Sequence, residues 1–210
     1  MIIVDYGAGN LTSVRNALEF LGIKSEISSE PEEIESAEKI IFPGVGAAAA
    51  AMENLNKSGI GDALEKAFKK RTPILGICIG CQIILEESEE DGGVKCLGFL
   101  QGKAAKFKKE PNLKIPHIGW NQVNLTKEHP IFKGIPNNSN FYFVHSFAPF
   151  ACDTAAVYGT TTYGSQTFPC VIGNGSNLIA TQFHLEKSGD IGLEVLRNFS
   201  RLLSPSSNGR

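Results

Sequence analysis

The sequence lacks the features that would tie the protein to a membrane or to nucleic acid. None of its apolar runs approaches the ~20 residues that a membrane-spanning helix needs. Residues 1–5 form a short segment without basic side chains, typical of a buried strand and not of a signal peptide. The net charge is only -2, and the basic runs at 66–71 and 106–109 are too weak for a nucleic-acid surface. We interpret these runs as a solvated face or as the rim of a contact with a protein partner.

The cysteine pattern excludes a disulfide framework and a zinc site. Five cysteines are an odd number without framework spacing, which favours free thiols in a reducing cytoplasm. Cys78 and Cys81 form a Cys-x-x-Cys pair, but no second Cys/His pair at short spacing accompanies it, so we expect no metal. A redox pair would not need the glycines that flank Cys78. We interpret Cys81 as a small buried apolar side chain.

The sequence also lacks a complete dinucleotide-binding loop. Gly7-Ala8-Gly9-Asn10 follows the first apolar run, but the third glycine expected at position 12 is Thr12. No acidic residue clearly ends a second strand at the required distance. A tight turn in which Asn10 caps the next helix is the better interpretation, and we expect no cofactor.

Hydrophobic patterning divides the chain into two halves. In the first half β-type runs alternate with helical patterns, which predicts a largely parallel sheet with helices on both faces. The predicted strands are 2–4, 25–28, 39–42 and 74–77, and the predicted helices are 11–21, one starting at Pro31, 47–55, 60–70 and 80–87. Later β-type runs lie at 99–107, 122–125, 140–147, 155–161, 170–173 and 178–182, before a helix at 191–203. We expect these runs to extend the same sheet with antiparallel strands. The result is a single-domain α/β three-layer sandwich over residues 1–203, with a frayed tail at 204–210.

The most informative segment is Gly76-Ile77-Cys78-Ile79-Gly80, at the end of the run 74–77. A nucleophile with a glycine two residues away on either side is typical of a sharp strand-to-helix turn. The glycines let such a turn close, because they carry no Cβ. Cysteine supplies a thiolate nucleophile where a base lies nearby, so the segment predicts that Cys78 is a nucleophile.

His184 is the best candidate for the base among the four histidines. It follows the apolar run 178–182, and Glu186 lies close enough to bind the distal ring nitrogen and to fix the tautomer. A His-x-Glu pair alone is more often structural than catalytic. Beside a glycine-flanked cysteine, the catalytic interpretation is favoured. His129, which precedes Pro130, is assigned to a loop.

Pro43-Gly44-Val45-Gly46 forms a second glycine-rich turn where the run 39–42 ends. A turn at the end of a parallel strand can aim backbone N–H groups into a site, and acyl transfer needs such donors where the oxyanion develops. A plain strand-to-helix turn would explain the glycines equally well without Cys78.

Six segments, in order along the chain, together resemble one family. They are 5–10 (DYGAGN), 43–46 (PGVG), 76–82 (GICIGCQ), 116–121 (PHIGWN), 142–147 (YFVHSF) and 180–188 (ATQFHLEKS). The pattern resembles the triad-type, class I glutamine amidotransferases, and among them the glutaminase subunits of imidazole glycerol phosphate synthase. The likeness spans nearly the whole chain. The cysteine turn and the His-x-Glu mark the superfamily, whereas segments 5–10, 116–121 and 142–147 narrow it to these subunits.

The resemblance implies a catalytic triad of Cys78, His184 and Glu186, in which the thiol attacks the carboxamide of glutamine and forms a γ-glutamyl thioester. It implies that backbone N–H groups of Ile79 and, after a peptide rearrangement, of Val45 form the oxyanion hole. It implies no metal and no cofactor. The positions that match glutamine-binding positions of the family are Gly46, Gln82, His145, Ser146 and Phe147.

The resemblance also implies a partner and a cytoplasmic heterodimer. The partner would be a (β/α)8-barrel cyclase, which makes imidazole glycerol phosphate and AICAR in histidine biosynthesis, switches the glutaminase on and receives its ammonia through the barrel. The positions that match the partner-facing surface are Asn10, Trp120, Tyr142 and Lys187. Trp120, the only tryptophan, lies in a Gly-Trp-Asn segment that we expect to form a turn and that suits an interface anchor, although a tryptophan is more commonly buried in the core.

Two positions depart from the family pattern. Leu185 stands where proline usually separates the histidine from the glutamate, and it loosens the backbone without removing a chemical group, so we expect activity to survive. Phe147 stands where tyrosine is common, at the cost of at most one hydroxyl contact.

Two other functions stay open. One is a paralogue that feeds ammonia to a cyclase-like synthase in surface-sugar (acetamidino sugar) biosynthesis. The other is a catalytically silent scaffold, against which the intact triad residues argue.

Overall fold

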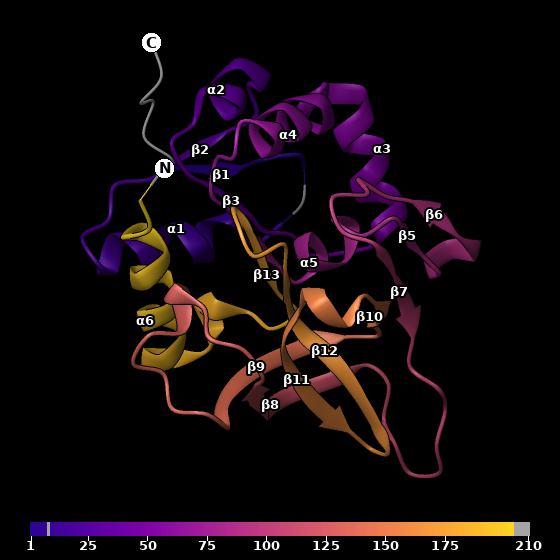
Figure 1. Ribbon diagram of the computed structural model, residues 1–210. Coiled ribbons are helices and arrows are strands. Elements are labelled where there is room, and N and C mark those ends of the chain that lie inside the picture. The colour runs from indigo at the N-terminus through magenta and orange to yellow at the C-terminus, as the bar shows by residue number, and fades with distance from the viewer. Residues whose placement is uncertain (8, 204–210) are drawn as a thin grey trace.

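A nine-stranded mixed sheet forms the centre of the protein, and helices cover both of its faces (Figure 1). The computed structural model describes residues 1–7 and 9–203, so the tail expected to fray at 204–210 lies outside the described residues. The strands of the central sheet are β1 (Ile2–Val4), β2 (Glu26–Ser28), β3 (Ile40–Phe42), β4 (Ile74–Ile77), β8 (His117–Leu125), β9 (Ser139–His145), β11 (Val157–Tyr163), β12 (Gln166–Gly173) and β13 (Leu178–Thr181). The helices are α1 (Leu11–Phe20), α2 (Pro31–Ser36), α3 (Ala48–Ser58), α4 (Ile60–Lys69), α5 (Ile79–Ile83) and α6 (Gly189–Ser200). Within the described ranges, no helix combines the length and the apolar character needed to cross a membrane.

The order of the strands places the last strand of the chain in the middle of the central sheet. The order is β2-β1-β3-β4-β13-β12-β11-β8-β9, and the first five strands are parallel. The remaining strands pair antiparallel with their neighbours. In the parallel pair β4–β13, Ile77 lies opposite Thr181. The residues that follow these two strands therefore emerge side by side at the carboxyl edge of the sheet, where α/β proteins place their sites.

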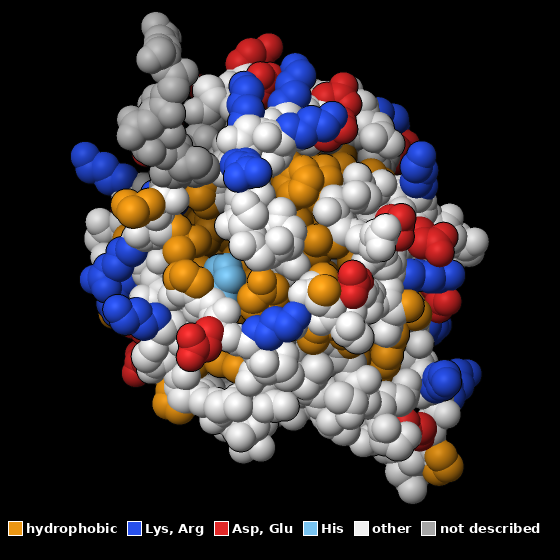
Figure 2. Space-filling model, viewed as in Figure 1, with side chains coloured by type: hydrophobic (Ala, Val, Ile, Leu, Met, Phe, Trp, Pro, Cys, Tyr) orange, Lys and Arg blue, Asp and Glu red, His pale blue; other side chains and the backbone are white. Residues whose placement is uncertain are grey.

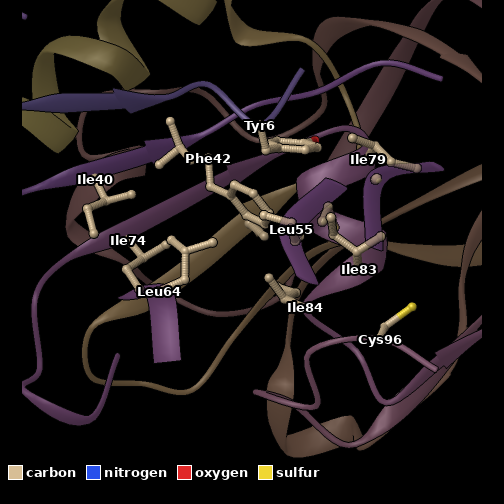
Figure 3. Close-up of a cluster of buried hydrophobic side chains, with 14 of the residues drawn as sticks. Tyr6, Ile40, Phe42, Leu55, Leu64, Ile74, Ile79, Ile83, Ile84 and Cys96 are labelled. Carbon is tan, nitrogen blue, oxygen red and sulfur yellow. The ribbon is translucent and has the colours of Figure 1, made fainter. Parts of the chain in front are cut away.

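Alternate residues of the parallel strands face two separate hydrophobic cores. In β3, Ile40 and Phe42 pack in the core that includes α3, α4 and α5, part of which Figure 3 shows. Ile41 between them packs in the opposite core, with α1 and α6. Burial on both faces explains why β1, β3 and β4 are apolar throughout and do not alternate with polar residues. The expected α/β three-layer sandwich with a largely parallel core is confirmed.

The expectation that every later β-type run extends the central sheet is wrong. A separate four-stranded sheet, in the order β10-β7-β5-β6, consists of β5 (Glu87–Ser88), β6 (Val94–Lys95), β7 (Gly102–Lys106) and β10 (Phe147–Cys152). The predicted strand 140–147 ends at His145, and the chain continues as β10, in which Phe147 pairs with Lys106 of β7. Hydrophobic periodicity identifies a strand but not the strand that it pairs with.

Two element boundaries also differ from prediction, each for a local reason. α5 ends at Ile83, short of the predicted 87, because Glu87 and Ser88 pair with β7 and β6 as strand β5. β8 begins at His117 and pairs with β9 from His117 to Val123, so Trp120 lies in a strand and not in a turn.

A comparison of two helical glycines tests the packing. A Cβ on Gly192 of α6 would lie 2.0 Å from the carbonyl oxygen of Leu185, whereas on Gly61 of α4 its nearest neighbour would be 3.5 Å away. Gly192→Ala should therefore reduce the free energy of unfolding by about 1–3 kcal/mol. The control Gly61→Ala should leave it unchanged or raise it by up to about 1 kcal/mol. Urea denaturation of the purified chain measures both, and equal stability of the two variants would contradict this packing.

Candidate active site

Cys78 lies on a tight turn between β4 and α5. Its φ of 55° is in the left-handed region, which a residue with a side chain seldom adopts, and its N–H donates to the Thr181 carbonyl of β13 at 2.8 Å. Gly80, two residues after Cys78, must lack a side chain, because a Cβ at this position would lie 2.0 Å from the Phe42 carbonyl oxygen. The strained cysteine at the start of a helix is the arrangement that the Gly-x-Cys-x-Gly segment predicts.

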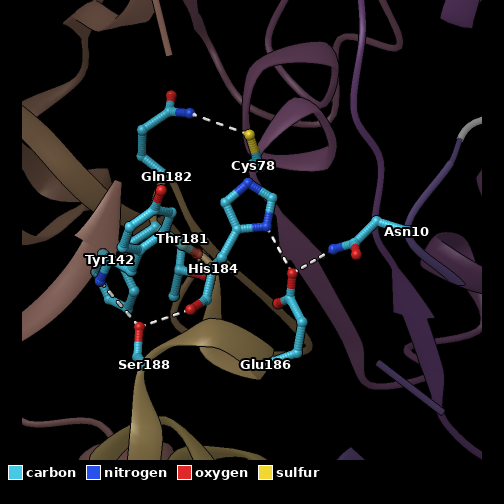
Figure 4. A network of polar contacts seen from close by, with 9 residues as sticks. Asn10, Cys78, Tyr142, Thr181, Gln182, His184, Glu186 and Ser188 are labelled. Atoms are coloured by element: carbon cyan, nitrogen blue, oxygen red, sulfur yellow. Dashed lines mark hydrogen bonds and ion pairs between the residues drawn. The ribbon is translucent and has the colours of Figure 1, made fainter. Parts of the chain in front are cut away.

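His184 follows β13 and places its ring beside Cys78 (Figure 4). Its Nδ1 and the Glu186 Oε1 are 2.6 Å apart, and the two side chains are almost fully buried. Its backbone is fixed as well: His184 N donates to the Tyr142 carbonyl at 2.9 Å, and Ser188 Oγ donates to the His184 carbonyl. Among the described residues Nε2 has no hydrogen-bond partner, and it is the ring nitrogen nearest to the Cys78 thiol (Figure 4).

The surroundings of His184 favour its charged form. Burial lowers its pKa, but the nearby Cys78 sulfur and the Glu186 carboxylate outweigh burial and raise the pKa to about 10. At neutral pH the ring can therefore hold a proton between the Glu186 carboxylate and the Cys78 sulfur. A histidine beside a cysteine and oriented by a third group is the arrangement expected of an activated nucleophile.

Asn10 contributes to this arrangement in a way that the sequence did not predict. Its backbone precedes α1 with φ 75°, but its side chain makes no capping hydrogen bond, so the expected helix cap is wrong. The side-chain amide donates instead to Glu186 Oε1, the oxygen that also binds His184 (Figure 4). A capping residue whose side chain accepts a backbone N–H typically lies in the extended region, whereas the Asn10 backbone is left-handed. Asn10 thus links the first loop of the chain to the His184–Glu186 pair.

The other four cysteines are free, and their surroundings keep them protonated. Burial raises the pKa of Cys81 and of Cys170 well above the usual value, and raises that of Cys96 and of Cys152 to about 11. Cys81 is fully buried in the hydrophobic core, where the sequence placed it. Within the described chain, no group of three or more His, Cys, Asp or Glu side chains could hold a metal ion.

The turn at Pro43 to Gly46 lies directly against Cys78, and its Gly44 carbonyl occupies a neighbouring backbone donor. The backbone N–H of Ile79 donates to this carbonyl at 3.4 Å. This N–H is the one expected to serve as an oxyanion donor, so with respect to that expected role the turn is closed. Gly46 has φ 100°, a conformation that glycine adopts readily, and Val45 is 38% exposed. The peptide rearrangement expected at Val45 remains a prediction.

A cavity of about 290 Å³ opens above Cys78 and His184. Its walls include all five positions expected to bind glutamine: Gly46, Gln82, His145, Ser146 and Phe147. They also include Glu90, the one acidic side chain among the lining residues, which accepts a hydrogen bond from Ala48 N at 2.6 Å. The sequence could not single out Glu90, because it lies within an acidic run at 86–91.

Gln182 is a second residue that sequence reasoning missed. It is fully buried, and its Nε2 lies 3.8 Å from the Cys78 sulfur. Its Oε1 accepts from Gln82 Nε2 at 3.1 Å, and Gln82 also donates to the Phe147 carbonyl at 2.9 Å. The two amides therefore join the Cys78 sulfur to the far wall of the cavity.

A chain of directed hydrogen bonds supports the same wall from behind. His145 Nδ1 lies 2.8 Å from the Phe147 carbonyl and must donate to it, so His145 Nε2 is an acceptor. His117 Nδ1, 3.1 Å away, then donates to His145, and His117 Nε2 accepts from the Asn121 amide. Both rings must be neutral for this chain. Burial agrees, because it lowers the pKa of His117 to about 4 and that of His145 to about 3.

Three of the positions expected to face a partner form one surface beside the site. Trp120 is 57% exposed and contacts the Tyr142 ring edge-on, with ring centroids 6.0 Å apart. The Lys187 ammonium lies over the same Tyr142 ring, 6.0 Å from its centroid. Ile118, two residues before Trp120 on β8, is also exposed. That this surface faces a partner remains a prediction.

A larger cavity, of about 830 Å³, lies elsewhere and lacks the chemistry of a reaction site. It is lined by residues of the segment 125–137, including His129, and contains no cysteine. His129 is the one histidine that is not buried. On the face of the molecule that Figure 2 shows, a histidine side chain lies among apolar side chains. His129 begins a 3-10 turn in which its ring accepts from Ile131 N, consistent with the loop predicted there.

The chain is similar to known proteins over nearly its full length. Residues 2–202 match the family described as glutamine amidotransferase class-I. A Methanocaldococcus jannaschii relative described as imidazole glycerol phosphate synthase subunit HisH is 48% identical over 201 residues, 96% of this chain and 98% of the relative. A Dehalococcoides mccartyi relative of the same description is 44% identical over 200 residues, 95% of this chain and 96% of the relative. A solved glutamine amidotransferase shares the fold, with a TM-score of 0.73 at 18% identity over 94% of this chain and 98% of that one.

The histidines predict how stability depends on pH. His117, His129 and His145 have lowered pKa values when folded, so between about pH 6.5 and 5 the unfolded chain binds more protons and stability falls. His184 has a raised pKa, so its contribution is complete below about pH 6.5 and is lost as pH rises toward about 10. The free energy of unfolding should be greatest near pH 6.5 and should fall by roughly 1 kcal/mol per unit for each lowered histidine. Urea denaturation from pH 5 to 9 checks this, and a flat profile would contradict the neutral His117–His145 pair.

Proposed function

The chain belongs to the class-I glutamine amidotransferase family, and on that premise we propose that it is the glutaminase subunit of an imidazole glycerol phosphate synthase. It hydrolyses glutamine to glutamate and ammonia, and the ammonia passes to a cyclase subunit that makes imidazole glycerol phosphate in histidine biosynthesis. The observation that carries the proposal is the strained Cys78 beside a buried His184–Glu186 pair. This geometry supports a working enzyme and not a silent scaffold.

The reaction follows from where the protons lie. The Cys78 thiolate attacks the side-chain carbonyl carbon of glutamine, and a C–S bond forms as the oxygen becomes an oxyanion. His184, which holds the thiol proton, gives it to the departing nitrogen, so the C–N bond breaks and ammonia leaves. Water then loses a proton to His184 and attacks the γ-glutamyl thioester. The C–S bond breaks, glutamate leaves, and the proton returns to Cys78.

Glu186 and Asn10 act through His184. The Glu186 carboxylate holds Nδ1 and stabilises the imidazolium that exists while the thiolate is charged. Asn10 restrains the same carboxylate oxygen. Leu185 replaces the proline usual at this position, yet the His184–Glu186 contact is formed, which supports the expectation that activity survives.

The cavity walls supply contacts for the rest of the substrate. Glu90 is placed to bind the ammonium group of glutamine, and the backbone from His145 to Phe147 provides polar groups for its carboxylate and carboxamide. Gln82 holds the Phe147 carbonyl in place. Because the wall is supported by neutral histidines, it carries no positive charge of its own.

The isolated chain is expected to be nearly idle. An oxyanion donor is typically worth about 3 kcal/mol of transition-state stabilisation, and here the Ile79 N–H is occupied by the Gly44 carbonyl. Docking of the cyclase would open the turn and free the N–H groups of Ile79 and Val45. The surface formed by Trp120, Tyr142 and Lys187 adjoins the His184 backbone through Tyr142, so it can transmit docking to the site.

The proposal includes a cytoplasmic location for the complex. Five free cysteines suit a reducing compartment, and buried thiols with raised pKa values resist oxidation there.

The first test is loss of the nucleophile. Cys78→Ser should reduce glutamate release by at least roughly 1,000-fold in the presence of the purified cyclase and its nucleotide substrate, because the alcohol is a far weaker nucleophile beside His184. Cys81→Ala is the matched control and should keep near-wild-type turnover, since its thiol only packs. Substantial turnover by Cys78→Ser would refute the assignment. If the wild-type complex released glutamate but formed no imidazole glycerol phosphate, that outcome would instead favour a cyclase-like partner in another pathway.

The partner surface has its own test. Trp120→Ala should weaken binding to the purified cyclase at least tenfold in a titration, as removal of an exposed aromatic anchor does. Circular dichroism should show an unchanged fold. Phe20→Ala is a matched control, because Phe20 is a 79% exposed aromatic on α1 outside this surface. Equal affinity of both variants would exclude Trp120 from the interface.

A further inference from the structure

Among the described residues, the buried side-chain atoms without a hydrogen-bond partner are the Tyr6 hydroxyl, His184 Nε2 and Glu186 Oε2, and the mechanism above gives no role to Tyr6. Tyr6 follows β1 and is only 3% exposed, packed against the Phe42 ring with centroids 5.2 Å apart. In the part of the chain that the structure describes, its Oη has no hydrogen-bond partner. Burial, and after it the charge of Cys78, raise the pKa of Tyr6, so the hydroxyl keeps its proton and is a potential donor. A buried donor without a partner is unfavourable and calls for an explanation.

The hydroxyl lies between the two backbone segments that must form the oxyanion hole. A Cβ built on Gly44 would lie 1.9 Å from Tyr6 Oη and 2.2 Å from Ile79 Cγ2. Figure 3 shows the hydroxyl directed toward Ile79. Position 44 can hold only glycine while Tyr6 is there. The close approach places a protonated hydroxyl against the peptide whose carbonyl closes the site.

Opening the turn leaves the Gly44 carbonyl in need of a new donor. That carbonyl now accepts the Ile79 N–H, at 3.4 Å. Once the N–H turns to the substrate oxyanion, the carbonyl would be a buried acceptor without a partner, which costs as much as a lost hydrogen bond. Rotation of the peptide between Gly44 and Val45 moves this carbonyl and aims the Val45 N–H in the opposite direction.

We propose that Tyr6 is a positioning residue of the oxyanion hole, whose hydroxyl donates to the Gly44 carbonyl when the turn opens. This inference rests on the glutaminase function proposed above. The closed state has one unpaired hydroxyl, and the open state pairs the hydroxyl and the displaced carbonyl with each other. Tyr6 therefore favours the open state without touching glutamine.

The test compares Tyr6→Phe with the wild-type chain, each in complex with the purified cyclase and its nucleotide substrate. The variant should lower the kcat for glutamate release about tenfold, the effect of one buried hydrogen bond, and should leave the KM for glutamine unchanged. The free energy of unfolding of the isolated chain should stay the same or rise, because the closed state loses only an unpaired hydroxyl. Tyr158→Phe is the matched control. Tyr158 lines a different cavity and does not contact the turn, so this variant should change none of these values.

Two further readouts separate a positioning role from a structural one. The rate at which iodoacetamide alkylates Cys78 should be unchanged in Tyr6→Phe, since the variant leaves Cys78, His184 and Glu186 in place. The 15N amide resonances of Val45 and Ile79 should shift when the cyclase binds the wild-type chain, and should shift less in the variant.

The outcomes that would overturn the inference are distinct. A wild-type kcat in Tyr6→Phe would show that the hydroxyl is not used. A joint loss of stability, alkylation rate and kcat would assign Tyr6 to packing alone. A raised basal turnover would mean that the hydroxyl holds the turn closed. If the wild-type complex releases no glutamate, the proposed function fails and this inference fails with it.

Discussion

The parallel pairing of β13 with β4 is the contact on which the site depends. It places Thr181 opposite Ile77, so that the residues leaving each strand meet at one edge of the sheet. Cys78 donates its N–H back across this pair to Thr181, and His184 follows three residues later. A slip of one residue would turn every side chain of β13 to the opposite core and carry His184 away from the thiol. The full burial of both strands fixes the register, so the fold itself sets the geometry of the reaction.

The side chains of the site are already assembled, whereas the backbone turn expected to supply oxyanion donors is closed. Cys78, His184 and Glu186 are assembled and buried, whereas the Ile79 N–H still donates to the Gly44 carbonyl. These parts respond to different forces. The ion pair is held by Coulomb attraction in a region of low dielectric, and the turn by a single long hydrogen bond. A modest input of free energy can therefore change the turn and leave the triad as it is.

Local patterns in the sequence predicted much of the arrangement of the site. The glycines around Cys78 predict a strained turn, and the two-residue spacing brings Glu186 to His184, because both depend only on neighbouring residues. Contacts between distant segments were not predictable in this way. Asparagine is a common helix-capping residue, yet the Asn10 side chain binds the Glu186 carboxylate, 176 residues further along the chain. Glu90, Gln182 and the Tyr6 hydroxyl enter the site only through the packing of separate elements, and the second sheet arises from a pairing choice that periodicity does not encode.

The state of the cysteines has a consequence for how the protein can be studied. Burial raises the pKa of four of the five thiols, whereas Cys78 alone lies beside a histidine whose pKa is raised. A soft electrophile at neutral pH should consequently react with one sulfur in the whole chain. The protein carries its own selective attachment point, at which a fluorescent or spin label would report on the turn, on the cavity and on the arrival of a partner without prior removal of any other cysteine.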